Sequence, residues 1–382
     1  MIERSVMWFW NRVDVSTASP DRSLQVVRWL VGLYLLVIEA PHYTWIDEAP
    51  TAFFDPPVFS IAHLAGAFPA EPFFLVLDLV GIAAIVLMTV GVRTRAATIV
   101  VVVCRLIGTS FLFSFGKIDH TIMLTVFLAL MAYCEWGRQP LRTSGAARDV
   151  ACATAARSQR ARSLYAVVLA FGFLTAGLPK LLKWVDGDTS TSGFLSWYYE
   201  GVLDLRRDGM LADLVPGIPA TLLELVDVAA VGVEVVGFLA LLLGRLWWRS
   251  FLLLVSMLHL ANVLVLNIEF SAQAITYLAF ADLTLAALSD GTVAARRWKW
   301  VGGVALASVV AWHVQARVRG DGSPIAFIPG YQHQIEFGLY FGALIGVAMV
   351  VVFGREVSRE FRSSHASDDH AIGVSPASTP QG

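Results

Sequence analysis

Residues 72–115 read PFFLVLDLVGIAAIVLMTVGVRTRAATIVVVVCRLIGTSFLFSF. Two apolar runs, 72–90 and 96–115, flank the basic turn GVRTR. A helix needs about 20 apolar residues to cross the hydrocarbon core of a membrane, because each residue adds about 1.5 Å to its length. Both runs have close to that length, so the stretch predicts two transmembrane helices joined by a short loop.

The same pattern extends over most of the chain. Of its 382 residues, 57% are hydrophobic and only 15% are charged, whereas globular domains are about half apolar and about a quarter charged. The fold class predicted from this pattern is all-α, a polytopic transmembrane helix bundle of ten spans. Two of the spans, 119–134 and 272–288, are short enough to be tilted or re-entrant. The predicted spans are 24–40, 72–90, 96–115, 119–134, 163–182, 219–243, 250–268, 272–288, 300–316 and 335–353.

The basic residues predict the orientation. If the N-terminus lies inside, cytoplasmic segments hold 20 of the 28 Lys and Arg residues and outer segments hold seven. Cytoplasmic loops of membrane proteins carry such an excess. We therefore expect a multi-pass protein of the plasma membrane with both termini in the cytoplasm. The expected parts are an N-terminal cytoplasmic segment (1–23), a transmembrane domain (24–353) and a disordered cytoplasmic tail (354–382).

Composition argues against several functions. A net charge of −2 is unlike the basic surface of a nucleic-acid-binding protein. Cys104, Cys134 and Cys152 form no CxxC pair, which argues against a dithiol relay. The chain lacks Walker, dinucleotide-binding and HExxH motifs, and no metal site is predicted.

Four ionisable residues fall inside predicted spans at a similar distance from the inner face. An ionisable side chain at mid-bilayer costs about 2.5–3.5 kcal/mol and calls for a partner. We expect the four to form one buried polar network. It can serve as a proton relay or a polar cofactor pocket, or it can simply hold helices together. The four residues are Arg105, Glu234, His259 and Asp282.

A second polar layer is predicted near the outer face. Asp119 and His120 end the string GKIDH, and Lys180 lies in AGLPKLLKW, where Pro179 is expected to break the helix. A lysine there can extend to the headgroups. Alternatively, burial can lower its pKa until it serves as a base. In that case Lys180 should point into an apolar cavity that it shares with His120 and that is capped by Trp197 or its neighbours.

Several strings resemble one membrane family. YAVVLAFGFLTAGLPKL (165–181), LHLANVLVLNIEFSAQAITYLAF (258–280), VGVRTR and GKIDH are similar, in this order, to the horizontally transferred transmembrane (HTTM) family. That family includes the membrane part of vitamin K-dependent gamma-carboxylase and is distantly related to DoxX-like proteins. The likeness covers roughly residues 20–290.

The resemblance implies roles for particular residues. Lys180 matches a lysine that acts as a base once a reduced quinone and oxygen are supplied, and His120 matches a supporting histidine. His259 and Asn262 match a further FHxxN-like stretch. The implied cofactor is a quinol of the menaquinone or vitamin K type.

The resemblance also has departures. The carboxylase carries a large lumenal C-terminal region, whereas two extra spans and a short tail follow here, which argues against peptide glutamate carboxylation. Two functions stay open: a quinol-dependent membrane enzyme, or a non-catalytic accessory protein for the maturation, export or anchoring of a partner. A small-solute transporter is less favoured, because the two halves show no inverted repeat. The expected partners are membrane lipids, a lipid quinone and a partner membrane or secreted protein.

Overall fold

The computed structural model describes residues 2–116, 120–137, 145–204, 209–283, 293–319, 323, 325, 328 and 330–372. Every regular element in these ranges is helical, which confirms the all-α class. The α-helices are α1 (Ile2–Thr17), α2 (Asp21–Val37), α3 (Glu71–Val90), α4 (Thr94–Leu112), α5 (Ile122–Cys134), α6 (Gly145–Trp184), α7 (Gly193–Tyr199), α8 (Ala220–Val235), α9 (Gly237–Leu243), α10 (Arg245–Leu266), α11 (Ser271–Ala274), α12 (Val293–Val318) and α13 (Tyr331–Ile372). The short 3₁₀ helices are η1 (Thr44–Glu48), η2 (Thr51–Phe53), η3 (Ala62–Leu64), η4 (Phe113–Phe115), η5 (Glu135–Gly137), η7 (Ala212–Gly217) and η8 (Ile275–Phe280), and η6 (Glu200–Asp204) is a π-helix.

Five described helices are long and apolar enough to cross a membrane. They correspond to the predicted spans 72–90, 96–115, 163–182, 250–268 and 335–353. A sixth predicted span, 219–243, is divided into α8 and α9, which meet at an angle of 54°. The protein is therefore all-α with several helices of membrane-spanning length.

The remaining four predicted spans are not established by the structure. α2 has 17 residues and α5 has 13, both short of the roughly 20 that a perpendicular crossing needs. In 272–288, helix ends at Phe280, and 284–288 lie outside the described ranges. α11 and η8 together extend only about 18 Å at their ordinary rises of about 1.5 and 2.0 Å per residue. The span 300–316 lies within α12, which is not among the five.

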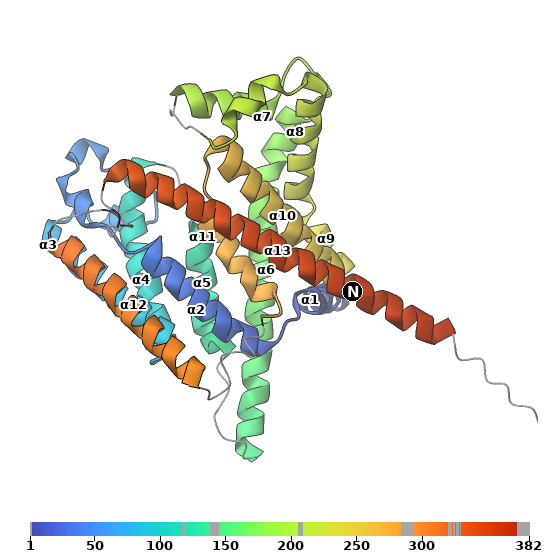
Figure 1. Ribbon diagram of the computed structural model, residues 1–382, viewed down its shortest axis with the longest axis horizontal. Coiled ribbons are helices and arrows are strands. Elements are labelled where there is room, and N and C mark those ends of the chain that lie inside the picture. The colour runs from blue at the N-terminus through green and yellow to red at the C-terminus, as the bar shows by residue number, and fades with distance from the viewer. Residues whose placement is uncertain are drawn as a thin grey trace, which may run out of the picture.

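Figure 1 shows how the helices are arranged. The long α13 lies along α10 and passes beside α11, while α12 packs against α3 and α2. α1 lies against α6 and α9. Hydrogen bonds fix this contact: Ser16 donates to the carbonyl of Leu241, and the Thr17 and Ser163 hydroxyls are 3.1 Å apart.

α13 continues to Ile372, although the sequence predicted a disordered tail from residue 354. Ion pairs explain part of the difference. Glu356 pairs with the buried guanidinium of Arg249, and Glu360 lies 2.9 Å from the Arg245 guanidinium. These ion pairs hold the polar part of α13 against α10. The polar composition of the tail does not reveal them, because the basic residues lie more than 100 positions earlier in the sequence.

A second ionic group holds the chain where it leaves α2. Asp78 of α3 and Arg317 of α12 are both completely buried, 3.5 Å apart. The Asp78 carboxylate also accepts the backbone N–H groups of Tyr43, at 2.9 Å, and Thr44, at 3.3 Å. Arg317 donates to the carbonyl of Pro41 at 2.8 Å. One ion pair thus fixes α3, α12 and the segment 41–44.

Candidate functional site

Lys180 and Glu234 form a short ion pair between α6 and α8. Lys180 Nζ lies 2.6 Å from Glu234 Oε1, and the two side chains are only 17% and 9% exposed. An ammonium and a carboxylate at this distance make a charge-assisted hydrogen bond. The pair provides adjacent proton donor and acceptor groups that are largely screened from solvent.

Close helix packing makes the pair possible. A Cβ added to Gly177, three residues before Lys180, would lie 2.7 Å from the Cβ of Glu234. Any larger residue would therefore separate α6 from α8. Residues three apart lie on the same face of a helix, so the face of α6 that touches Glu234 also presents Lys180.

Two indole rings enclose the ammonium of Lys180. Its Nζ lies 5.2 Å from the ring centroid of Trp184 and 4.8 Å from that of Trp197, within the range of a cation–π contact. Trp197 thus lies over Lys180, the residue that it was expected to cap. Pro179 does not end the helix as expected, because α6 continues through it to Trp184.

Acidic residues of α8 hold the segment that carries Trp197. Asp227 is completely buried and accepts the N–H groups of Gly193 and Phe194, at 3.0 and 2.7 Å, at the start of α7. Glu224 accepts the N–H of Gly187 at 3.2 Å. Asp227 and Glu234 are seven residues apart and so lie on one helix face. One face of α8 therefore positions both the counterion and the aromatic cover of Lys180.

Three aromatic rings are stacked beside this pair. The ring centroid of Phe270 lies 4.3 Å from that of His120 and 4.4 Å from that of His259. His259 Nε2 is 2.8 Å from the hydroxyl of Tyr277. Both His120 and Lys180 act electrostatically on His259, which places the ring stack and the Lys180–Glu234 pair in one neighbourhood.

Two residues of this stack were missed by the sequence analysis. Phe270 and Tyr277 lie in the string 258–280 that carries the family resemblance. The sequence analysis selected His259 because it is ionisable and lies within a predicted span, and this criterion did not select Phe270 or Tyr277. Asn262 lies one turn after His259, and its carbonyl accepts the N–H of Ile268 at 3.2 Å. In this structure its backbone helps to close the end of α10.

The platform beneath the stack is the segment 271–281, in which every residue is buried. Its first residue, Ser271, lies 2.8 Å from the hydroxyl of Tyr34 and donates to Glu269. Gly342 of α13 lies against Glu269, since an added Cβ would be 3.0 Å from Glu269 Cγ. Burial, together with the nearby Glu39, raises the pKa of Glu269 to about 7, against the hydrogen bond from Ser271. A carboxyl that titrates near neutrality thus borders the ring stack.

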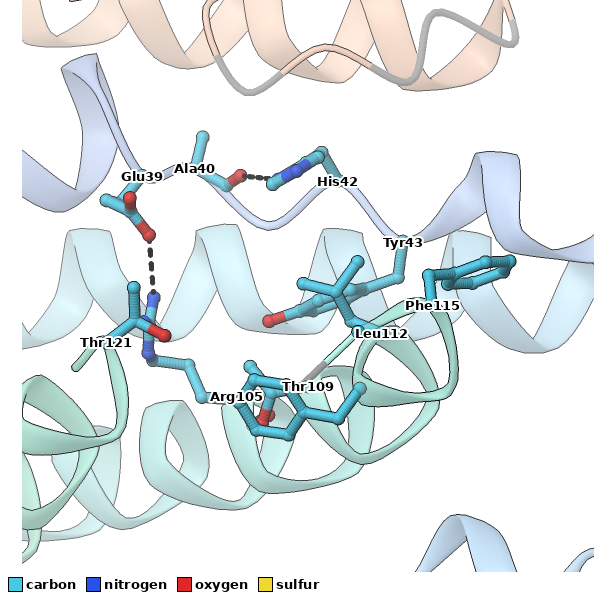
Figure 2. Close-up of a pocket in the computed structure, with 11 residues that line it drawn as sticks. Glu39, Ala40, His42, Tyr43, Arg105, Thr109, Leu112, Phe115 and Thr121 are labelled. Atoms are coloured by element: carbon cyan, nitrogen blue, oxygen red, sulfur yellow. Dashed lines mark hydrogen bonds and ion pairs between the residues drawn. The ribbon is translucent and has the colours of Figure 1, made fainter. Parts of the chain in front are cut away.

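The four residues expected to form one network have separate partners. Glu234 pairs with Lys180 and His259 with Tyr277, as described above. Arg105 lies 3.6 Å from Glu39 (Figure 2), and Asp282 lies 3.1 Å from Arg245. Counting residues from the inner face misplaced Asp282, because the continuous helix assumed over 272–288 ends at Phe280.

The expectation that Lys180 points into an apolar cavity with His120 is not met in this form. Lys180 is directed at Glu234 and the two indoles, and His120 faces Phe270. Asp119 lies outside the described residues. Within the described ranges, no group of three His, Cys, Asp or Glu side chains is arranged to hold a metal ion.

Neither a family model, nor a curated protein, nor a solved structure matches this chain.

Proposed function

We propose that this protein is a membrane enzyme of the HTTM, carboxylase-like type, in which Lys180 and Glu234 act together on a lipid-borne quinol. The observation that carries the proposal is the 2.6 Å contact between these two side chains beneath two indole rings. The proposed setting is the plasma membrane, with ten spans and both termini in the cytoplasm.

The pair can act as a base without creating a net charge. With one proton between them, the two groups exist either as ammonium and carboxylate or as amine and carboxylic acid. Both forms have zero net charge. Because a poorly solvated site disfavours charged species, the form with an amine and a carboxylic acid costs little additional free energy there. Glu234 can therefore accept the proton of Lys180 across a distance of 2.6 Å. Lys180 is then a neutral amine, which is basic and nucleophilic.

The surrounding residues fit a quinol. A quinol is favoured because its planar ring can stack on aromatic side chains such as those of Trp184, Trp197 and Phe270. Two histidines and Tyr277 supply hydrogen-bonding groups for ring oxygens. A bound quinol would supply reducing equivalents for reaction with oxygen, while Lys180 and Glu234 would hold and move a proton.

The test is oxygen uptake by purified protein supplied with a reduced naphthoquinone, with the bound quinone identified by extraction and mass spectrometry. We expect Lys180→Ala to reduce uptake at least a hundredfold and Glu234→Gln to reduce it strongly, because glutamine cannot take the proton. Lys183→Ala is the matched control. Lys183 is exposed one turn further along α6, and its loss should change little.

Full activity of Lys180→Ala would refute the catalytic role. If the same variant also left the phenotype of living cells unchanged, we would interpret the protein as a non-catalytic accessory protein rather than as an enzyme. The pair would then be a structural link between α6 and α8.

A further inference from the structure

Two cavities lie next to each other, and neither has Lys180 or Glu234 in its lining. One, of about 320 Å³, lies between the end of α2, α4 and the start of α5. The other, of about 340 Å³, lies between α4, α5 and the segment 57–61. Thr109, Phe113 and Thr121 line both cavities, so the two are adjacent. A ligand that extended through both would be polar at one end and apolar at the other.

The first cavity contains a buried cation. Arg105 is 5% exposed. Its Nε donates to Thr125 at 3.4 Å, and its Nη1 is 3.6 Å from Glu39, too far for a hydrogen bond (Figure 2). A guanidinium has five N–H donors in a planar fork that suits a carboxylate or phosphate. Among the described residues, Thr125 and Glu39 are the two polar contacts of the Arg105 side chain, so its other N–H groups can donate to a ligand in the cavity.

Glu39 is the acid that faces Arg105 in this cavity. Its side chain is 28% exposed, so this end of the ion pair is accessible to solvent. His42, which also lines the cavity, is fixed by its contact with the carbonyl of Ala40 at 2.9 Å. Arg105 is therefore the cavity residue suited to bind an anionic headgroup.

The second cavity is lined mainly by apolar side chains that stay exposed. Val58 is 70% exposed, Phe59 is 99% exposed and Ile61 is 46% exposed, and Leu106 and Ile122 form the opposite side. Phe59 has a φ of 68°, a left-handed conformation that is unfavourable for a bulky residue. These side chains give the second cavity a lining that suits an acyl chain.

We propose that the two adjacent cavities together bind a single-chain lipid amphiphile with a carboxylate or phosphate headgroup. Arg105 binds the headgroup, and the chain runs past Thr109 and Phe113 along the segment 57–61. The site does not use Lys180, and its occupancy does not depend on the function proposed above.

The test measures binding of radiolabelled palmitate and dodecyl phosphate to the full-length protein in phosphatidylcholine nanodiscs. We expect Arg105→Gln to weaken both at least tenfold while leaving a neutral dodecyl glycoside unaffected. Arg95→Gln is the matched control, because Arg95 is 57% exposed on the same helix. Ile61→Asp should weaken all three probes, since it places a charge in the path of the chain.

Unchanged binding of both anionic probes to Arg105→Gln would overturn the proposal. Displacement of palmitate by inorganic phosphate at equal concentration would also overturn it, because the chain would then contribute nothing. If Arg105→Gln is not recovered as folded protein, Ile61→Asp still decides, since Ile61 is partly exposed. Unchanged binding to that variant counts against the site.

Discussion

Replacing Asp78 by alanine tests how much the buried ion pair contributes to stability. The change leaves Arg317, which is completely buried, without this counterion. It also removes the acceptor of the Tyr43 and Thr44 N–H groups, which now donate to Asp78 at 2.9 and 3.3 Å. Removing one member of a buried pair costs about 3–5 kcal/mol, and each unsatisfied buried donor adds about 1–3 kcal/mol. We expect a loss of about 5 kcal/mol or more in the free energy of unfolding.

The assay is unfolding in mixed micelles by increasing amounts of SDS, followed by circular dichroism. Glu71→Gln is the control, because Glu71 lies exposed at the start of the same helix. The double variant Asp78→Asn, Arg317→Gln should recover part of the loss, since it leaves no unpaired charge. A single-variant loss below about 1 kcal/mol, the range of surface ion pairs, would refute the reasoning.

Three further predictions use other parts of the molecule. Because burial raises the pKa of Glu269 to about 7, the folded protein keeps a proton that the unfolded chain loses near pH 4.5. The contribution of protonated Glu269 to the free energy of unfolding is therefore fully present below pH 4.5 and declines as the pH rises to about 7. The melting temperature of Glu269→Gln should lack this dependence on pH. Glu356→Ala should leave Arg249 short of a partner and release the end of α13, which limited trypsin digestion followed by mass spectrometry would detect as earlier cleavage after Arg355. Reporter fusions after Arg142 and after residue 382 should both report cytoplasm, and either one reporting the outside would contradict ten spans.

Local pattern predicted the long helices well. The apolar run 72–90 became Glu71–Val90, and 96–115 became Thr94–Phe115, because an uninterrupted apolar run in a membrane has helix as its favoured structure. The bend between α8 and α9 was not predicted. The bend falls at Val236, directly before Gly237. A Cβ added to Gly237 would lie 3.3 Å from Ala170 of α6. That constraint comes from packing against α6, which the sequence of α8 alone does not contain.

The sequence analysis singled out some residues of the candidate site but not their pairings. Lys180, Glu234 and His259 were each identified by chemistry that is unusual in a span. The pairing of Lys180 with Glu234 depends on Gly177 bringing α6 onto α8, and the stacking of His259 depends on Phe270 after the end of α10. Both are contacts between residues distant in sequence, and depth along isolated helices could not resolve them.

The buried segment 271–281 has a consequence for the lipid environment. Bilayers that differ in thickness act on membrane proteins through helices in contact with acyl chains, which tilt or shift to match the hydrocarbon layer. Ser271 to Ala281 are shielded from that contact by neighbouring helices. Tyr277 lies on this segment, and Phe270 immediately precedes it. The depth of the ring stack is therefore set by protein rather than by lipid, so its geometry should persist as membrane composition changes with growth temperature.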